Sequence, residues 1–285
     1  MNVRLVAPFI EEEISMVAHQ LGALKSPGPD GFPSMFYHKF WNEAKESVNH
    51  AAMDWFNGRA QLGEINKTYI ALIPKVAALE STCQFRPISL YNTSYKILSK
   101  ILANRLKQIL PEIISDSQTA FVQGRLIQDN IGVAHEAFHD LRLKKKGKNY
   151  EAGLKVDMSK AYDRVEWYFL AAAMAKIVSF SILLNGKPGA PFSPSRGLRQ
   201  GDPLSPYLFL IISEVLSLNL SKLVNDGEIA GVKVARGGPV LSHLFFADDS
   251  LFLFKADASN CACLKKLLHE YCLALVLCGF QLHQN

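Results

Sequence analysis

The chain has 285 residues, 49% of them hydrophobic, which is enough apolar material for one large core or two smaller ones. Its 31 Lys and Arg against 26 Asp and Glu give a net charge of +5, which fits a polyanionic partner without selecting one. Five cysteines and no secretory signal argue against a disulfide-built secreted domain, so we expect an intracellular protein, nuclear or cytoplasmic, with reduced thiols and no targeting signal.

The N-terminal third reads as helices, a stiff loop and one strand. Apolar residues at helical spacing predict a helix over 10–24, and segment 26–31, Ser-Pro-Gly-Pro-Asp-Gly, predicts a loop. That loop either separates two helices or brings backbone close to a ligand. A further helix is predicted over 34–56 and a strand over 68–75.

The middle of the chain continues with helices and one strand that ends in an acid. Segment 85–90 leads into a helix over 95–110, and another helix is predicted over 127–143. A charged loop over 144–148 follows, and then a strand over 152–157 that ends at Asp157.

The C-terminal part alternates helix and strand in the same way. The predicted elements are a helix over 164–176, a β-branched run over 177–184 closed by Asn185-Gly186, a helix over 204–224 and a buried hairpin over 241–254. The longest apolar stretch, 204–220, contains Ser205, Ser213, Glu214 and Ser217, so it predicts no membrane span.

Carboxylates stand where two of these predicted strands end. Asp157 closes one strand, and Asp248 and Asp249 form the tip of the predicted hairpin. Hard carboxylate oxygens at the ends of buried strands suit divalent cations, as in sites that hold two ions about 4 Å apart for phosphoryl transfer. The plainer interpretation is a tight turn, in which Asp is common.

Ordered motifs surround these acids. They are Val156-Asp-Met-Ser-Lys-Ala-Tyr-Asp163, Gly197-Leu-Arg-Gln-Gly-Asp-Pro-Leu-Ser-Pro206 and Phe245-Phe-Ala-Asp-Asp249. They resemble the A, B and C motifs of reverse transcriptases, and their wording is most similar to plant-type LINE (non-LTR) retrotransposons. Segments upstream resemble the family's finger blocks in the same order, at residues 25–31, 72–75, 85–90 and 118–125.

The resemblance implies an α+β fold, the right hand of a polymerase. Its fingers would occupy 1–95, and its palm 96–176 with the catalytic strand. A shortened return to the fingers would follow at 177–199, and then the palm again at 200–285 with the catalytic hairpin. We expect an antiparallel palm sheet packed by helices. We also expect a truncated fragment without a thumb, because the pattern drifts after Cys272.

The resemblance also implies an RNA-directed DNA polymerase that adds dNTPs to a primer 3′-hydroxyl. Asp157, Asp248 and Asp249 would be catalytic and would hold two Mg²⁺ ions, with Mn²⁺ as an alternative. The incoming dNTP would be bound by Lys75, Arg86, Tyr162, Gln200 and Gly201, of which Tyr162 matches the ring that excludes a ribose 2′-hydroxyl.

The same resemblance names the nucleic acids as partners. RNA template and DNA primer would contact Lys96, Lys100, Arg105 and Arg125 through their phosphates. Each of these residues also has a plainer interpretation as an ordinary surface charge on a solvated helix face or loop. No membrane is implied, and no protein partner is identified.

Two zinc sites are alternatives. His135, Glu136 and His139 form an HExxH pattern on a predicted helix, as in zinc metalloproteases. No Gly-x-x-His follows, and the candidate third ligands, Glu151 and Glu166, flank the strand that carries Asp157, so this alternative is remote. A zinc knuckle of cysteines with His269 is also disfavoured, because the spacing indicates buried thiols instead, at Cys261, Cys263, Cys272 and Cys278.

One junction departs from the family. The predicted helix 164–176 runs into the strand 177–184 without a Gly, Pro, Asn or Asp between them, although such connections usually contain turn residues. This indicates a deletion or a gene-model artefact beside the catalytic residues. We therefore expect an impaired or inactive polymerase, with a non-catalytic nucleic-acid-binding remnant as the alternative.

Overall fold

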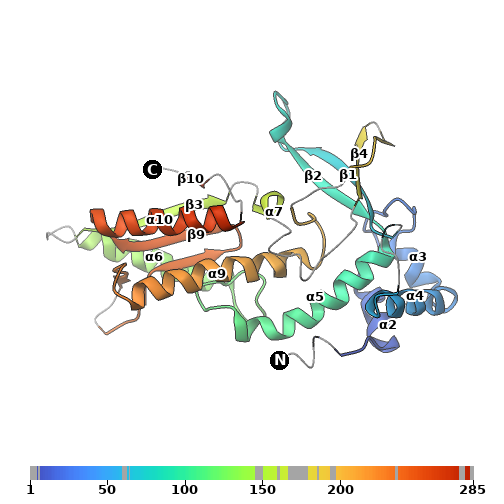
Figure 1. Ribbon diagram of the computed structural model, residues 1–285, viewed down its shortest axis with the longest axis horizontal. Coiled ribbons are helices and arrows are strands. Elements are labelled where there is room, and N and C mark those ends of the chain that lie inside the picture. Colours follow the sequence, from blue (N-terminus) through green and yellow to red (C-terminus); the bar gives the residue numbers. More distant parts are fainter. Residues whose placement is uncertain are drawn as a thin grey trace. The chain divides into compact units, whose positions relative to one another are not determined.

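The computed structural model shows a mixed helix-and-sheet protein that divides into two compact units (Figure 1). The first unit combines Met1–Leu106 with Glu166–Ser205, and the second combines Lys107–Val165 with Pro206–Asn285. The residues that the structure describes are 5, 7–59, 63, 65–144, 150–158, 161–165, 179–184, 186–192, 197–234, 237–275 and 280–282. The assignment of fingers and palm, with its boundaries at 95, 176 and 199, stays a prediction.

Helices of the first unit enclose an apolar core. The helices are α2 (Glu11–Gln20), α3 (Ser34–Lys39), α4 (Trp41–Phe56) and the first half of α5 (Thr93–Ile113). Ile14 and Val17 of α2 are fully buried against Ile97 and Ile101 of α5. These apolar side chains recur at helical spacing, so each helix turns one apolar face toward the core.

The predicted helix over 34–56 is wrong in one respect, because it is two helices. Phe40 lies between α3 and α4 with φ −115° and ψ 36°, outside the helical region. Its N–H still donates to the carbonyl oxygen of Phe36 at 2.9 Å, which closes α3. No Gly or Pro marks this break in the sequence.

A four-stranded sheet completes the first unit. Its order is β2–β1–β4–β5, with bounds β1 (Lys67–Pro74), β2 (Phe85–Tyr91), β4 (Ser179–Leu184) and β5 (Lys187–Pro188). Strand β1 pairs antiparallel with β2 and parallel with β4. The connection from β1 to β2 ends in a short 3₁₀ turn, Thr82–Gln84. Segment 85–90 is thus a strand, which the sequence analysis missed. Pro87 is compatible with it because β2 is an edge strand.

The loop over 26–31 packs against the junction between β2 and α5. Lys96 donates from Nζ to the carbonyl oxygen of Ser26 at 2.6 Å, and the Asp30 N–H donates to Asn92 Oδ1 at 3.2 Å. A Cβ on Gly28 would lie 2.2 Å from the backbone nitrogen of Asn92. The sequence left open whether this loop brings its backbone close to a ligand. In the structure the backbone at Gly28 lies close to Asn92 of the same chain.

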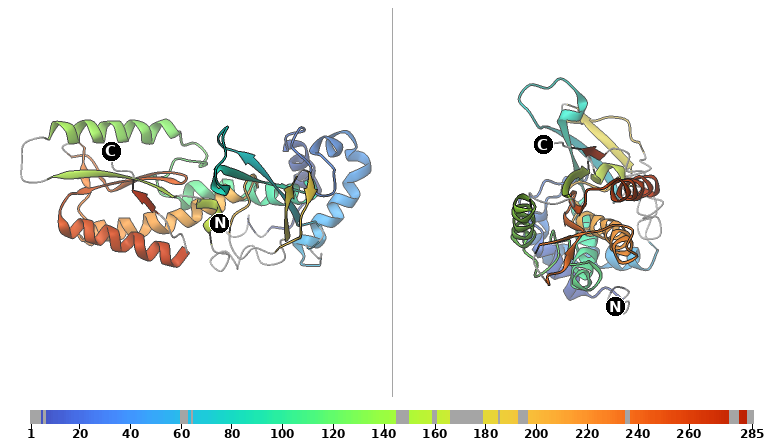
Figure 2. Two further views of the ribbon diagram at one scale, coloured as in Figure 1. Left: turned by 90° about the horizontal axis from the view of Figure 1, so that it is seen from above. Right: turned by 90° about the vertical axis from the view of Figure 1, so that its left-hand side faces the viewer.

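The second unit is built on an antiparallel sheet. Its order is β10–β3–β9–β8, with bounds β3 (Glu151–Met158), β8 (His243–Phe246), β9 (Asp249–Lys255) and β10 (Phe280–Leu282). Helix α6 (Ile127–Leu143) covers one face, and α9 (Ser205–Asn225) with α10 (Ala258–Leu275) covers the other (Figure 2). A short ribbon, β6 (Val232–Lys233) with β7 (Val240–Leu241), completes the unit.

Burial on both faces explains why β9 does not alternate polar and apolar residues. Its Leu251 and Leu253 pack with Ala137 of α6, and Phe252 is buried as well. Gly153 on β3 lies under the ring of Phe138, since a Cβ there would be 2.7 Å from it. A strand buried on both sides reads as a continuous apolar run.

Helix α9 is long and apolar enough to cross a membrane by length and composition, with a mean hydropathy of 1.6. Half of that apolar window is buried inside the protein. Its Glu214 accepts hydrogen bonds from the N–H and the hydroxyl of Ser115, both at 3.0 Å. These contacts are typical of a helix in a protein core.

The predicted helix over 164–176 lies largely outside the described residues. The structure describes α7 (Ala161–Arg164) and Val165, but not 166–178. The predicted junction at 176 and 177 therefore stays a prediction.

We predict that Gly28→Ala destabilises the protein by about 1–3 kcal/mol, because the added methyl group meets backbone atoms that cannot move aside. Gly189→Ala in the same unit is the control. Its Cβ would have only an ordinary 3.5 Å contact, so we expect a change within about 0.5 kcal/mol. Urea unfolding measures both, and equal stabilities of the two variants would contradict the packing of the loop.

Candidate active site

Three aspartates lie at one end of the second sheet. Asp157 near the end of β3 pairs with Asp249, the first residue of β9. Asp248 precedes it in the β8–β9 turn, where its carbonyl oxygen accepts the N–H of Met158 at 3.2 Å. The hairpin predicted over 241–254, with acids at its tip, is confirmed.

Negative charge is concentrated around these residues. Partial burial raises the pKa of the Asp248 carboxyl, and the nearby Asp249 and Asp157 raise it further. Lys155 offsets part of this charge, since its Nζ lies 3.2 Å from Asp249 Oδ1 in a largely exposed ion pair. The sequence analysis missed Lys155, although it stands two residues before Asp157 and so on the same strand face.

These carboxylates fit divalent cations by ligand type. The negative charges of Asp249 and Asp157 raise the pKa of Asp248, and a bound cation would relieve that repulsion. Within the described part of the chain, no three His, Cys, Asp or Glu side chains are close enough together to hold a metal ion. The residues thus fit the ion by ligand type, but their side chains do not form a three-ligand group.

The two zinc alternatives gain no support. His135, Glu136 and His139 are exposed on α6, and no third ligand joins them among the residues that the structure describes. The prediction of buried thiols is wrong for Cys261, which is exposed on α10, and right for Cys272; neither forms a disulfide. Cys278 lies outside the described residues.

Tyr162 lies close to the carboxylates. Its ring stacks on Phe209 of α9, with centroids 5.3 Å apart and an interplanar angle of 14°. Burial and the charge of Asp248 raise its pKa to about 12, so the hydroxyl stays protonated at neutral pH. The structure thus brings Tyr162 together with Asp248, as its spacing from Asp157 suggested.

A loop from the 118–125 motif runs beside β8. The Phe245 N–H donates to the carbonyl oxygen of Ser117 at 2.7 Å, and Gln118 pairs with Phe245 as an isolated parallel bridge. The amide of Asn130 donates to both carbonyl oxygens, Ser117 at 2.7 Å and Phe245 at 3.2 Å. This motif therefore lies in the second unit, apart from the three other blocks that resemble finger segments.

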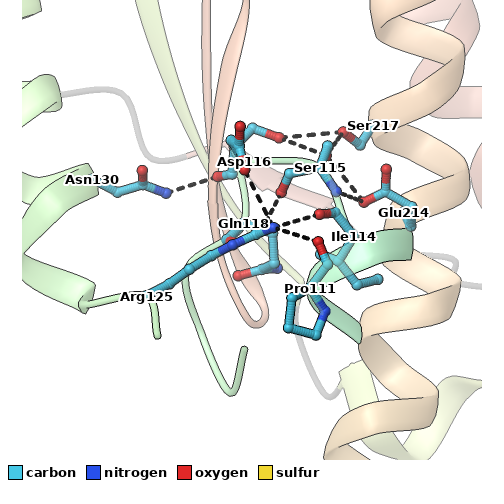
Figure 3. A network of polar contacts seen from close by, with 10 residues as sticks. Pro111, Ile114, Ser115, Asp116, Gln118, Arg125, Asn130, Glu214 and Ser217 are labelled. Carbon is cyan, nitrogen blue, oxygen red and sulfur yellow. Dashed lines mark hydrogen bonds and ion pairs between the residues drawn. The ribbon is translucent and has the colours of Figure 1, made fainter. Parts of the chain in front are cut away.

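Arg125 holds this loop together from inside (Figure 3). Its guanidinium donates to the carbonyl oxygens of Ser115 at 2.6 Å, Ile114 at 2.7 Å and Gln118 at 2.8 Å. It also lies 3.3 Å from the Asp116 carboxylate. Both terminal nitrogens of Arg125 are thus engaged within the chain, and its expected contact with nucleic acid stays a prediction.

The first unit contains the two cations predicted to bind the triphosphate. Lys75 directly follows β1, and its N–H donates to the carbonyl oxygen of Gln84 at 2.8 Å. Arg86 is two residues beyond Gln84 on β2, so both side chains belong to one face at the end of the β1–β2 hairpin. Both residues are exposed.

The turn at Gln200 and Gly201 is attached to β2 in the same unit. Ser89 donates its N–H to the carbonyl oxygen of Gln200 at 3.4 Å, and the Tyr91 hydroxyl donates to that of Gly201 at 3.0 Å. Gly201 has φ +96°, a conformation that favours glycine. The turn is therefore held by its backbone.

Buried charges support this turn, and the sequence analysis missed them. Arg199 lies over the rings of Tyr91 and Tyr95, with its Cζ 5.1 and 4.5 Å from their centroids, and it also bonds Asn66. Asp202 accepts hydrogen bonds from the Ser99 hydroxyl and the Leu204 N–H, while burial raises its pKa. Arg199 and Asp202 stand directly beside Gln200 and Gly201 in the sequence, and this position could have identified them as residues that support the turn.

The expected basic face of α5 is corrected for two residues. Arg105 is 8% exposed and donates two hydrogen bonds to Glu13, at 2.9 and 2.6 Å. Lys96 is 7% exposed and is bonded to Ser26, and burial lowers its pKa. Both hold the first unit together. Lys100 is half-buried and also makes an interaction, so its contact with nucleic acid stays a prediction.

Comparisons with known proteins agree with the motifs. A family model described as reverse transcriptase (RNA-dependent DNA polymerase) matches residues 73–284. The chain is 30% identical over 228 residues to the transposon TX1 uncharacterized 149 kDa protein of Xenopus laevis, covering 74% of this chain and 17% of that protein. It is 28% identical over 246 residues to the retrovirus-related Pol polyprotein from type-1 retrotransposable element R2 of Nasonia vitripennis, covering 79% and 22%.

A shorter match has higher identity. The chain is 48% identical over 68 residues to an uncharacterized mitochondrial protein of Arabidopsis thaliana, covering 24% of this chain and 56% of that protein. The chain thus spans less than two thirds of the length of each of these relatives.

A buried histidine lies next to the loop beside β8. His243 Nε2 is 2.9 Å from the Ser117 hydroxyl and 2.8 Å from the Ser217 hydroxyl, and Nδ1 is 2.8 Å from the Ser242 hydroxyl. Burial lowers its pKa from 6.5 to about 4. The folded protein therefore keeps this ring neutral over a pH range in which an unfolded chain protonates it.

We predict that His243 makes stability depend on pH in that window. As the pH falls from 6.5 to 4, the unfolded state gains a proton that the folded state does not, so the free energy of unfolding falls. The total loss is about 3 kcal/mol. In His243→Asn this loss disappears while the carboxylates titrate as before, so the wild type loses more stability than the variant. Parallel urea-unfolding profiles for the two proteins would contradict the neutral buried ring.

Proposed function

Because the chain belongs to the reverse transcriptase (RNA-dependent DNA polymerase) family, we propose that it is the polymerase domain of a non-LTR, LINE-type retrotransposon. In this proposal it copies an RNA template into DNA from a primer 3′-hydroxyl. The observation that carries the proposal is the pairing of Asp157 with Asp249 on adjacent strands, with Asp248 in the turn beside them. This arrangement supports a common cation site.

In the proposed reaction the primer 3′-oxygen attacks the α-phosphorus of a dNTP, and pyrophosphate leaves. Asp157 and Asp248 would hold Mg²⁺ or Mn²⁺, with Asp249 completing the set beside Lys155. Bound divalent ions lower the pKa of the attacking hydroxyl and stabilise the leaving pyrophosphate. The chain's own part is to supply acceptor oxygens in a rigid place, which suits catalysis by positioning and charge.

The first unit supports the role of fingers, and the second that of the palm. Lys75 and Arg86 offer two exposed cations on one hairpin face, which suits a triphosphate. The turn at Gln200 and Gly201 is held against β2 by its backbone, and the positive φ of Gly201 suits a close approach to substrate. The antiparallel order of the sheet supports the role of a palm, although helices cover both of its faces (Figure 2) where the resemblance implied one. The Arabidopsis relative favours a plant-type element.

We predict that the chain extends a DNA primer on an RNA template with Mg²⁺ and dNTPs, but slowly, because the sequence predicts an impaired polymerase. Asp248→Asn removes a carboxylate that would hold the cation, worth roughly 3 kcal/mol, so the rate falls about a hundredfold or more. Asp226→Asn, an exposed aspartate after α9, is the matched control and keeps the wild-type rate. Extension that survives in Asp248→Asn would contradict the proposed site. Retained RNA binding with no extension by the wild type would favour the non-catalytic alternative.

The position of Tyr162 generates a second expectation. Its ring stacks on Phe209, close enough to Asp248 for that charge to raise the pKa of Tyr162. At this place the ring would exclude a ribose 2′-hydroxyl. We predict that Tyr162→Val lowers the preference for dNTPs over rNTPs, measured as a ratio of kcat/KM values, by at least about tenfold. Tyr150→Val removes an exposed tyrosine of the same unit and leaves the ratio unchanged. An unchanged ratio in Tyr162→Val would contradict the role of Tyr162 in excluding the ribose 2′-hydroxyl.

A further inference from the structure

The turn that carries Asp248 has a strained backbone. Phe246 pairs with Asp249, so Ala247 and Asp248 form a two-residue connection between β8 and β9. Ala247 has φ +54°, in the left-handed region that a residue with a Cβ rarely adopts. Such a conformation persists only where neighbouring groups hold it.

Gln118 is the group that holds it. Its Oε1 accepts the Ala247 N–H at 3.2 Å and the Ala120 N–H at 3.0 Å. Because both partners are donors, the amide oxygen must face them. Gln118 is 1% exposed, and its Nε2 has no partner among the described residues. The side-chain amide thus makes both hydrogen bonds through Oε1, while its Nε2 is left without one in the described part of the chain.

The loop that carries Gln118 is fixed on two sides. Arg125 binds its carbonyl oxygens from within, and Glu214 of α9 binds Ser115 (Figure 3). On the other side the loop is bonded to the Phe245 backbone in β8, two residues before Ala247. The acceptor thus belongs to a rigid support, and the strained turn depends on it.

We propose that Gln118 is a positioning residue for Asp248. It acts through the Ala247 N–H and fixes where the turn presents the carboxylate to a divalent cation. Gln118 touches neither substrate nor cation in this role. The catalytic consequence of this inference rests on the proposed function. The coupling of Gln118 to Ala247 is independent of that function.

Gln118→Met tests the inference, because it keeps the length of the side chain and removes the strong acceptor. We expect the Ala247 amide to exchange with deuterium roughly tenfold faster, a measurement that needs no catalysis. We also expect weaker Mn²⁺ binding, by a similar factor, in a titration of the full chain. In primer extension kcat falls and the Mg²⁺ requirement rises, while KM for the dNTP stays the same.

The matched control is Thr119→Val in the same loop, since the Thr119 hydroxyl has no partner among the described residues. We expect wild-type exchange, Mn²⁺ binding and kcat from it. In an Ala247→Gly background the positive φ costs little, so Gln118→Met has a smaller effect on Mn²⁺ binding there. If Gln118→Met does not fold, Gln118→Asn, whose amide is one methylene shorter, carries the same expectations.

The outcomes separate the two proposals. Faster exchange at Ala247 with weaker Mn²⁺ binding supports the positioning role even if the wild type extends no primer, and in that case the proposed function fails alone. Wild-type exchange and Mn²⁺ binding in folded Gln118→Met overturn the positioning role, whatever the polymerase activity. An equal effect in Thr119→Val also overturns it, since the loss then comes from the loop as a whole.

Discussion

The antiparallel register between β3 and β9 is the constraint on which the candidate site depends. It sets Asp157 opposite Asp249 and places the turn with Asp248 at the same end of the sheet. A slip of one residue would turn Asp157 into the core and bring Val156 out, because side chains alternate along a strand. The close fit of Gly153 under the Phe138 ring opposes such a slip, because a neighbouring residue with a side chain would meet that ring, so the core also determines the geometry of the acids.

Each unit uses buried polar groups to hold a turn that carries candidate site residues. In the first unit, Arg199 and Asp202 lie beneath the backbone at Gln200 and Gly201. In the second, Arg125 and Gln118 support the turn at Asp248. Charged groups at such depth are costly unless their hydrogen bonds are satisfied, which explains the many carbonyl oxygens around the guanidinium of Arg125.

Much of the fold and the carboxylate set could be predicted from local patterns. Most helices have clear periodicity, the β8–β9 hairpin has a dense apolar run, and the acids stand at strand ends where these patterns stop. The strand at 85–91 was missed because Pro87 argues against a strand unless it is known to be an edge. The break at Phe40 carries no local signal. The burial of Lys96, Arg105 and Arg125 could not be read either, because it depends on the tertiary packing of a basic helix face and of a loop.

The parallel pairing of β1 with β4 has a consequence for synthesis of the chain. The segment Lys107–Val165, which belongs to the second unit, is translated between these two strands. Until β4 emerges, the hairpin of β1 and β2 has an open edge on β1, with N–H and C=O groups that any extended segment can pair with. Exposed Leu72 and Ile73 add apolar surface to that hairpin. The nascent chain therefore has a period in which association with a neighbouring copy competes with its own completion.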